Sequence, residues 1–153
     1  VVAPAFFILA LLAARAGGSE DIREMGGIAF RAPVLATLFL IVALANLAMP
    51  GSSNFVGEFL ILLGVFNAKI VIAIVAFIGV VLASVYTLRL FIRSMHNRVG
   101  PHVAPREIAV ADGLVIAPLV LAILALALYP QLPLDRSESS VQASIRDAKA
   151  LSR

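Results

Sequence analysis

One carboxylate stands alone inside an apolar run near the middle of the chain, directly after a break in helical sequence. Glu58 lies within the apolar run from Phe55 to Phe66, and the polar triplet Ser52-Ser53-Asn54 and the pair Pro50-Gly51 precede that run. An ionisable group deep in a bilayer costs at least about 2.5 kcal/mol on insertion scales, so such a group marks a candidate functional site. The chemistry open to one isolated carboxyl is the loading and release of a proton.

The residues before Glu58 predict an interrupted helix. Pro50 has no N–H to donate and disfavours helix at Met49, and Gly51 adds backbone freedom. Ser53 or Asn54 is expected to cap the helix that follows. Transporters build ion sites at broken helices of this kind, because irregular backbone at membrane depth must be covered by protein or line water. The alternative is a tight interfacial turn between two spanning helices, with Glu58 near the headgroups.

The composition is that of a membrane protein. Of the 153 residues, 61% are hydrophobic and 14% are charged, whereas soluble domains are about half apolar and a quarter charged. The absence of cysteine excludes disulfides and thiolate metal sites. The two histidines, His96 and His102, fall in a polar loop, and no nucleotide-binding glycine motif is present. We therefore expect no metal, redox cofactor or nucleic acid to bind this chain.

The apolar and polar runs predict an all-α, polytopic membrane helix bundle with one discontinuous transmembrane helix. The first apolar run, Val1 to Ala14, is shorter than the roughly 20 residues that span a bilayer, so we expect it to be the end of a helix that begins upstream and the chain to be a fragment. In the tail, Val141, Ile145, Ala148 and Leu151 recur at helical spacing. The predicted segments are the end of a transmembrane helix plus a charged loop (1–32), a broken transmembrane helix (33–68), two transmembrane helices (70–92 and 109–130) and a polar tail with a short amphipathic helix (131–153).

The distribution of charged residues in the loops indicates whether the broken element crosses the membrane once or twice. Residues 33–66 would reach about 50 Å as a helix, too long for one straight crossing of a core about 30 Å thick. If the element crosses once, loops 15–32 and 93–108 share one side and hold six arginines, while the other side holds Lys69 and, close to the membrane, only Arg136. Two crossings would remove this bias. The positive-inside rule therefore predicts one broken crossing, a periplasmic tail, and Glu58 near the midplane, about 12–16 Å from the surface.

Four stretches of the sequence carry a family resemblance. The run Asn46-Leu47-Ala48-Met49-Pro50-Gly51-Ser52-Ser53-Asn54-Phe55-Val56-Gly57-Glu58-Phe59 resembles the antiporter-like membrane subunit M (chain 4) of proton-pumping NADH-quinone oxidoreductase, respiratory complex I. Residues 21–27 (DIREMGG), 83–88 (ASVYTL) and the pair Tyr129-Pro130 are also similar to that family. The likeness covers most of the chain but only about the C-terminal third of a subunit with about fourteen helices.

The resemblance implies a function and the residues that perform it. Glu58 would be the buried proton-relay carboxylate of a late discontinuous helix in a non-redox subunit of a proton-translocating complex. Flavin, iron–sulfur clusters, quinone and NADH would belong to partner subunits, and the partners of this chain would be other membrane subunits, the lipid bilayer and protons. The family implies a multi-pass protein of the bacterial cytoplasmic (inner) membrane. The residues expected to support the break and its hydration are Asn46, Pro50, Gly51, Ser52, Ser53 and Asn54, and Lys69 marks a possible proton exit.

Two other interpretations remain open. A subunit of a related sodium/proton antiporter or of a membrane-bound hydrogenase would share the same fold. A structural or truncated membrane fragment without transport would use the same helices only for packing. Within the chain, Ser84 and Tyr86 either line a polar path or serve interhelical packing and interfacial anchoring.

Overall fold

The computed structural model describes residues 1–104 and 106–151, with side chains through residue 146. Within these residues the fold is all-helical, which confirms the predicted class. The helices are α1 (Val2–Arg15), α2 (Ile28–Arg31), α3 (Pro33–Asn46), α4 (Phe55–Ala68), α5 (Ile70–His96), α6 (Val110–Leu128) and α7 (Gln131–Leu151).

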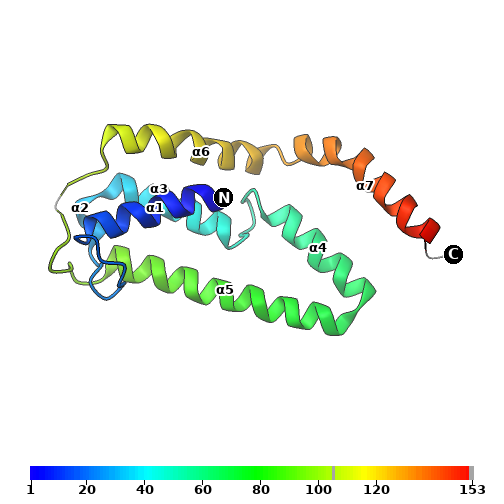
Figure 1. Ribbon diagram of the computed structural model, residues 1–153, viewed down its shortest axis with the longest axis horizontal. Coiled ribbons are helices and arrows are strands. Elements are labelled where there is room, and N and C mark those ends of the chain that lie inside the picture. The colour runs from blue at the N-terminus through cyan, green and yellow to red at the C-terminus, as the bar shows by residue number, and fades with distance from the viewer. Residues whose placement is uncertain (105, 152–153) are drawn as a thin grey trace.

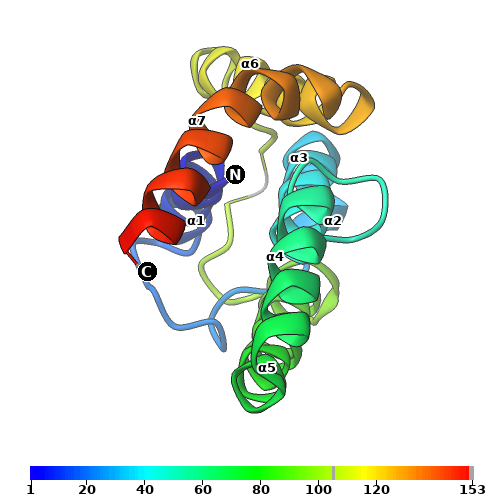
Figure 2. The same cartoon turned by 90° about the vertical axis from the view of Figure 1, so that its right-hand side faces the viewer.

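The helices run back and forth along one long axis (Figure 1). α1 runs toward the end at which the long loops gather, α3 runs away from that end, and α4 continues in the direction of α3 before α5 returns. α6 lies across the bundle above α1 and α3 (Figure 2), and α7 extends beyond it. α3 and α4 are thus the two halves of a single interrupted element, as the sequence predicted.

The core lies where α1, α3, α6 and the last turns of α5 meet. Its residues recur at intervals of four and three along each helix, the spacing that places side chains on one helical face. The Phe39 and Phe91 rings lie 5.3 Å apart and join α3 to α5. The buried positions that show this spacing are Ile8 and Leu12 in α1, Leu35, Phe39 and Val42 in α3, and Ile116, Val120 and Ile123 in α6.

The other half of the molecule has almost no core of its own. α4 contains no buried residue, and α5 is mostly exposed before Thr87. Among the described residues, α5 and α6 are long and apolar enough to cross a membrane, and α1, α3 and α4 are shorter apolar helices. The α4–α5 pair therefore presents apolar side chains outward, as a protein surrounded by lipid or by neighbouring membrane helices does.

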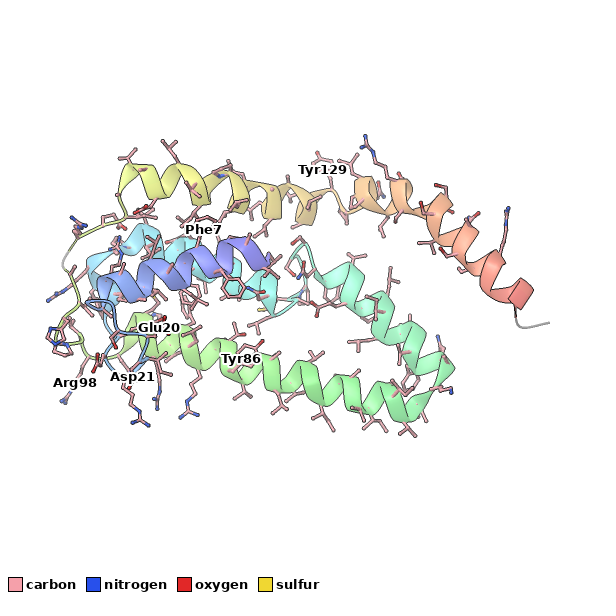
Figure 3. The ribbon with its side chains drawn as sticks, viewed as in Figure 1. Phe7, Glu20, Asp21, Tyr86, Arg98 and Tyr129 are labelled. Carbon is pink, nitrogen blue, oxygen red and sulfur yellow. The ribbon has the colours of Figure 1, made fainter. Side chains whose placement is uncertain are left out.

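The tail forms one long helix, α7, which makes no extensive contact with the rest of the bundle in the part of the chain that the structure describes. Of the apolar residues predicted to form its amphipathic face, Val141 and Ile145 are exposed. The side chains of Ala148 and Leu151 lie outside the described residues. Tyr129 lies at the α6–α7 junction (Figure 3), where the backbone leaves the helical conformation.

Candidate functional site

The interruption between α3 and α4 is built from backbone that is not helical. α3 ends at Asn46, and two residues beyond it have positive φ: Ala48 at 45° and Gly51 at 90°. The Gly51 conformation suits glycine, whereas the Ala48 conformation is uncommon for a residue with a Cβ. The Ser52 amide donates to the Met49 carbonyl at 2.8 Å, and the turn ends where α4 begins at Phe55. The sequence signal at Pro50-Gly51 therefore marks a tight, locally strained turn.

The predicted side-chain cap of α4 is wrong. Asn54 occupies the N-cap position but makes no side-chain capping bond, because its backbone is already helical (φ −86°, ψ −20°). A capping side chain reaches the free amides only from extended backbone. The hydroxyl oxygens of Ser52 and Ser53 are buried and have no hydrogen-bond partner. The side chains of the polar triplet therefore do not cap the first amides of α4 as expected. The hydroxyl groups of Ser52 and Ser53 remain available for another role.

Glu58 lies one turn into α4 and lines a cavity of about 290 Å³ between α3, α4 and α5. Its side chain is half-buried within this chain. The α5 residues of the cavity wall include Ala76, Val80 and Ser84. Because α5 runs from Ile70 to His96, this wall lies about 9–21 Å from its first residue in a helix about 40 Å long. The carboxyl group is thus beside the middle of the longest apolar helix.

The structure divides the predicted site residues among three cavities. Asn46 shares the cavity of Glu58, and its side-chain amide donates to the Val42 carbonyl at 3.1 Å, which leaves its amide oxygen available as an acceptor. Pro50, Gly51 and Ser52 line a second cavity of about 200 Å³ against α6. Ser53 and Asn54 line a third cavity of about 560 Å³ between α1, α4, α6 and α7.

Lys69, the predicted exit residue, lies apart from these cavities. It is exposed and extended (φ −152°, ψ 99°) at the junction of α4 and α5. Eleven residues separate it from Glu58, about 16 Å along a helix. The structure therefore does not bring the two charges together.

A small-residue face of α5 completes the Glu58 cavity and was missing from the predicted site. Gly79 and Ala83 lie one turn apart beside Ser84, whose hydroxyl donates to the Val80 carbonyl at 3.0 Å. Small side chains at this spacing leave room between helices, and the pattern was visible in the sequence. Of the two residues expected either to line a polar path or to serve packing and anchoring, Ser84 lines the cavity and Tyr86 is exposed.

A second polar cluster ties the loops together at the far end of the bundle. The Glu107 carboxylate accepts hydrogen bonds from the amides of Val34 at 3.0 Å and Leu35 at 3.3 Å, in the first turn of α3. Burial alone would raise the pKa of Glu107. The hydrogen bonds from the amides of Ile108, Val34 and Leu35, together with the charge of Arg15, hold this pKa below its usual value. The first turn of α3 is therefore capped by a carboxylate from the α5–α6 loop.

Two arginines at the ends of α1 and α2 bind backbone carbonyls of the α5–α6 loop. Arg15 donates to the Arg106 carbonyl, and Arg31 donates to the Val103 carbonyl at 2.6 Å. Glu20, Asp21 and Arg98 lie at this same end (Figure 3). We call this the loop end of the molecule; it joins residues 15–32 to residues 97–109, the two arginine-rich loops. Within the described ranges, no group of three or more His, Cys, Asp or Glu side chains is placed to hold a metal.

Comparison with known proteins relates this architecture to one class of membrane subunit. Residues 1–85 match the family model described as "NADH:quinone oxidoreductase/Mrp antiporter, TM". Proteins named NADH-quinone oxidoreductase subunit M are similar over about four fifths of the chain: 41% identical over 127 residues in Pseudomonas aeruginosa and 37% over 126 residues in Escherichia coli. A chain of respiratory complex I from Thermus thermophilus with bound NADH aligns with a TM-score of 0.72 and 36% identity.

The chain spans about a quarter of the length of these relatives. The alignments cover 80% of this chain and 24% of the Pseudomonas aeruginosa protein, 80% and 25% for the Escherichia coli protein, and 82% and 26% for the Thermus thermophilus chain. The matched region contains the interrupted element and Glu58.

Proposed function

Because this chain belongs to the NADH:quinone oxidoreductase/Mrp antiporter transmembrane family, we propose that it contributes the outlet part of a proton path in subunit M of a proton-translocating NADH:quinone oxidoreductase. Glu58 takes a proton from water on the loop-end side and releases it toward the opposite side. The loop end faces the bacterial cytoplasm, and the protein resides in the inner membrane. Other membrane subunits, lipid and protons are its partners, and electron transfer occurs elsewhere in the complex.

The position of Glu58 carries this proposal. A half-buried carboxyl group lines a cavity at the middle of α5, beside an interruption of non-helical backbone. Asn46 and Ser84 supply further polar atoms in the same cavity. A cavity with several polar partners can hold ordered water, and a carboxyl group in such a place exchanges protons with that water. A purely structural fragment has no need for an ionisable group at this depth.

The test is Glu58→Gln in the complete subunit, assembled in its complex and reconstituted in sealed vesicles. Glutamine keeps the shape and hydrogen bonding of the side chain but cannot release a proton. We expect normal assembly, and a fall in protons translocated per NADH oxidised or in coupled oxidation. Glu20→Gln, which neutralises an exposed loop carboxylate, is the matched control and should leave both quantities unchanged. Normal proton yield in Glu58→Gln would favour the structural account.

The family description itself supports one second candidate. It names Mrp antiporters together with NADH:quinone oxidoreductases, so a sodium/proton antiporter subunit would also have the same transmembrane fold. These two candidates, and the related membrane-bound hydrogenase, are separated by what co-purifies with the intact assembly: flavin and iron–sulfur clusters indicate the oxidoreductase, nickel indicates the hydrogenase, and neither indicates an antiporter.

A further inference from the structure

The hydroxyl groups of Ser52 and Ser53 are polar atoms for which the described residues provide no partner. Both oxygens are buried without a hydrogen bond, although the residues lie in a turn where capping bonds are usual. A buried hydroxyl left unsatisfied destabilises the folded state, so such groups are normally paired with protein or with ordered water. Each serine also lines a cavity, so a rotation about χ1 that turned the hydroxyl into that cavity would let water satisfy it.

These two cavities lie on the side of the interruption away from the Glu58 cavity. Ser52 faces α6 residues such as Leu124 and Ala127, and Ser53 lines the larger cavity of about 560 Å³. The larger cavity is lined mainly by apolar residues from α1, α4, α6 and α7 and reaches Ser137 in the first turns of α7. It therefore runs from the interruption to the α6–α7 junction, with polar residues at both ends.

The competing route from Glu58, along α4 and α5 to Lys69, offers nothing to hold water. Residues 59–66 of α4 and 70–78 of α5 contain no polar side chain. The eight residues 59–66 correspond to about 12 Å of helix. A chain of water molecules needs polar partners along its length, and this stretch has none before Asn67.

We propose that Ser52 and Ser53 bind water, and that protons from Glu58 leave through the interruption into the cavity between α1, α4, α6 and α7. The Glu58 carboxylic acid gives its proton to a water molecule and becomes a carboxylate, and the proton passes along the water that the serine hydroxyls hold as donors and acceptors. This proposal rests on the proposed function and assigns its exit. In this proposal, protons do not leave along α4 and α5 toward Lys69.

The absence of cysteine from the chain allows a direct test of which route contains water. Ser53→Cys introduces the only thiol of this chain, and Ala73→Cys places a thiol of similar size at a buried position on the competing route. Both variants are made in the complete subunit within its complex. A membrane-impermeant sulfonated methanethiosulfonate is added to the side opposite the loop end, and its attachment is read by mass spectrometry of the peptide.

We expect the thiol at position 53 to react at least about tenfold faster than the thiol at position 73, because the reacting thiolate forms only where water is present. No reaction at position 53, or reaction at position 73 that is equally fast, would overturn the proposal. If Ser53→Cys prevents assembly, Ser52→Cys is read in the same way. Ser52→Ala/Ser53→Ala should also slow proton translocation, and Ser52→Thr/Ser53→Thr, which restores both hydroxyls, should recover it.

The labelling separates this inference from the role of Glu58. A reactive thiol at position 53 together with normal pumping by Glu58→Gln would overturn the relay and leave the water-filled cavity standing. An unreactive thiol together with reduced pumping by Glu58→Gln would overturn the exit and leave the relay standing.

Discussion

The capping of α3 by Glu107 makes the sharpest prediction about stability. Pro33 has no N–H, the Ala36 amide already donates to the Ala32 carbonyl at 3.0 Å, and the amides of Val34 and Leu35 are bound by the Glu107 carboxylate. Glu107→Ala would leave these two amides without an acceptor. Loss of a capping side chain costs about 0.5–2 kcal/mol, typically about 1 kcal/mol.

That cost can be read at the two amides themselves. Hydrogen exchange in the intact complex reports local opening, and a loss of about 1–2 kcal/mol raises the exchange rate about five- to thirtyfold. Glu107→Gln keeps an acceptor oxygen but loses the charge that interacts with the N-terminus of α3, so we expect a smaller cost of about 0.3–1 kcal/mol. Glu20→Ala, in an exposed loop at the same end, is the control and should leave exchange at Val34 and Leu35 unchanged.

The order of the exchange rates among the variants tests whether Glu107 caps α3. The reasoning requires exchange at these amides to increase from wild type to Glu107→Gln to Glu107→Ala. If Glu107→Ala exchanges no faster than wild type, the cap contributes nothing, and the α5–α6 loop does not hold α3.

Three further predictions follow from the same structure. Because the pKa of Glu107 is held below its usual value, its contribution to the stability of α3 should be fully present above that usual value and lost as the pH falls through the lowered pKa. The difference in exchange between wild type and Glu107→Gln should shrink as the pH falls through the lowered pKa. A Cβ at position 100 would overlap the Glu24 carbonyl, so Gly100→Ala should cost at least about 1–3 kcal/mol and lower the yield of assembled complex, whereas Gly64→Ala, which meets open space, should cost nothing. Met95 is fully buried, and Met95→Ala should cost about 2–5 kcal/mol, seen as a lower melting temperature of the complex.

The helical architecture was open to prediction because its determinants are local. Apolar runs of sufficient length, the Pro50-Gly51 pair and the distribution of arginines predict an all-α membrane protein with one interrupted helix, and the structure confirms this. The predicted side-chain cap at Asn54 is wrong because of the local backbone conformation. Residue type alone does not fix backbone conformation, and Asn54 is already helical, so its side chain cannot reach the amides.

The Glu107 cap could not have been predicted from the sequence. Glu107 is separated from Val34 by 73 positions and from Leu35 by 72 positions, and no local pattern encodes such pairing. The wall of the Glu58 cavity could be predicted only in part. Gly79, Ala83 and Ser84 share a face of α5 by spacing alone, but only the packing of α4 against α5 shows which face meets Glu58. The role of Glu58 and of the supporting residues remains a prediction.

The two halves of the interrupted element are anchored very unequally. α3 is packed into the core and fastened at its start by a carboxylate, whereas α4 has no buried residue, no side-chain cap, and a glycine with positive φ four residues before it. A change of charge at Glu58 acts on the loosely held half. We expect α3 to stay fixed, so that any motion coupled to proton release occurs in α4 together with the helix α5 that packs against it.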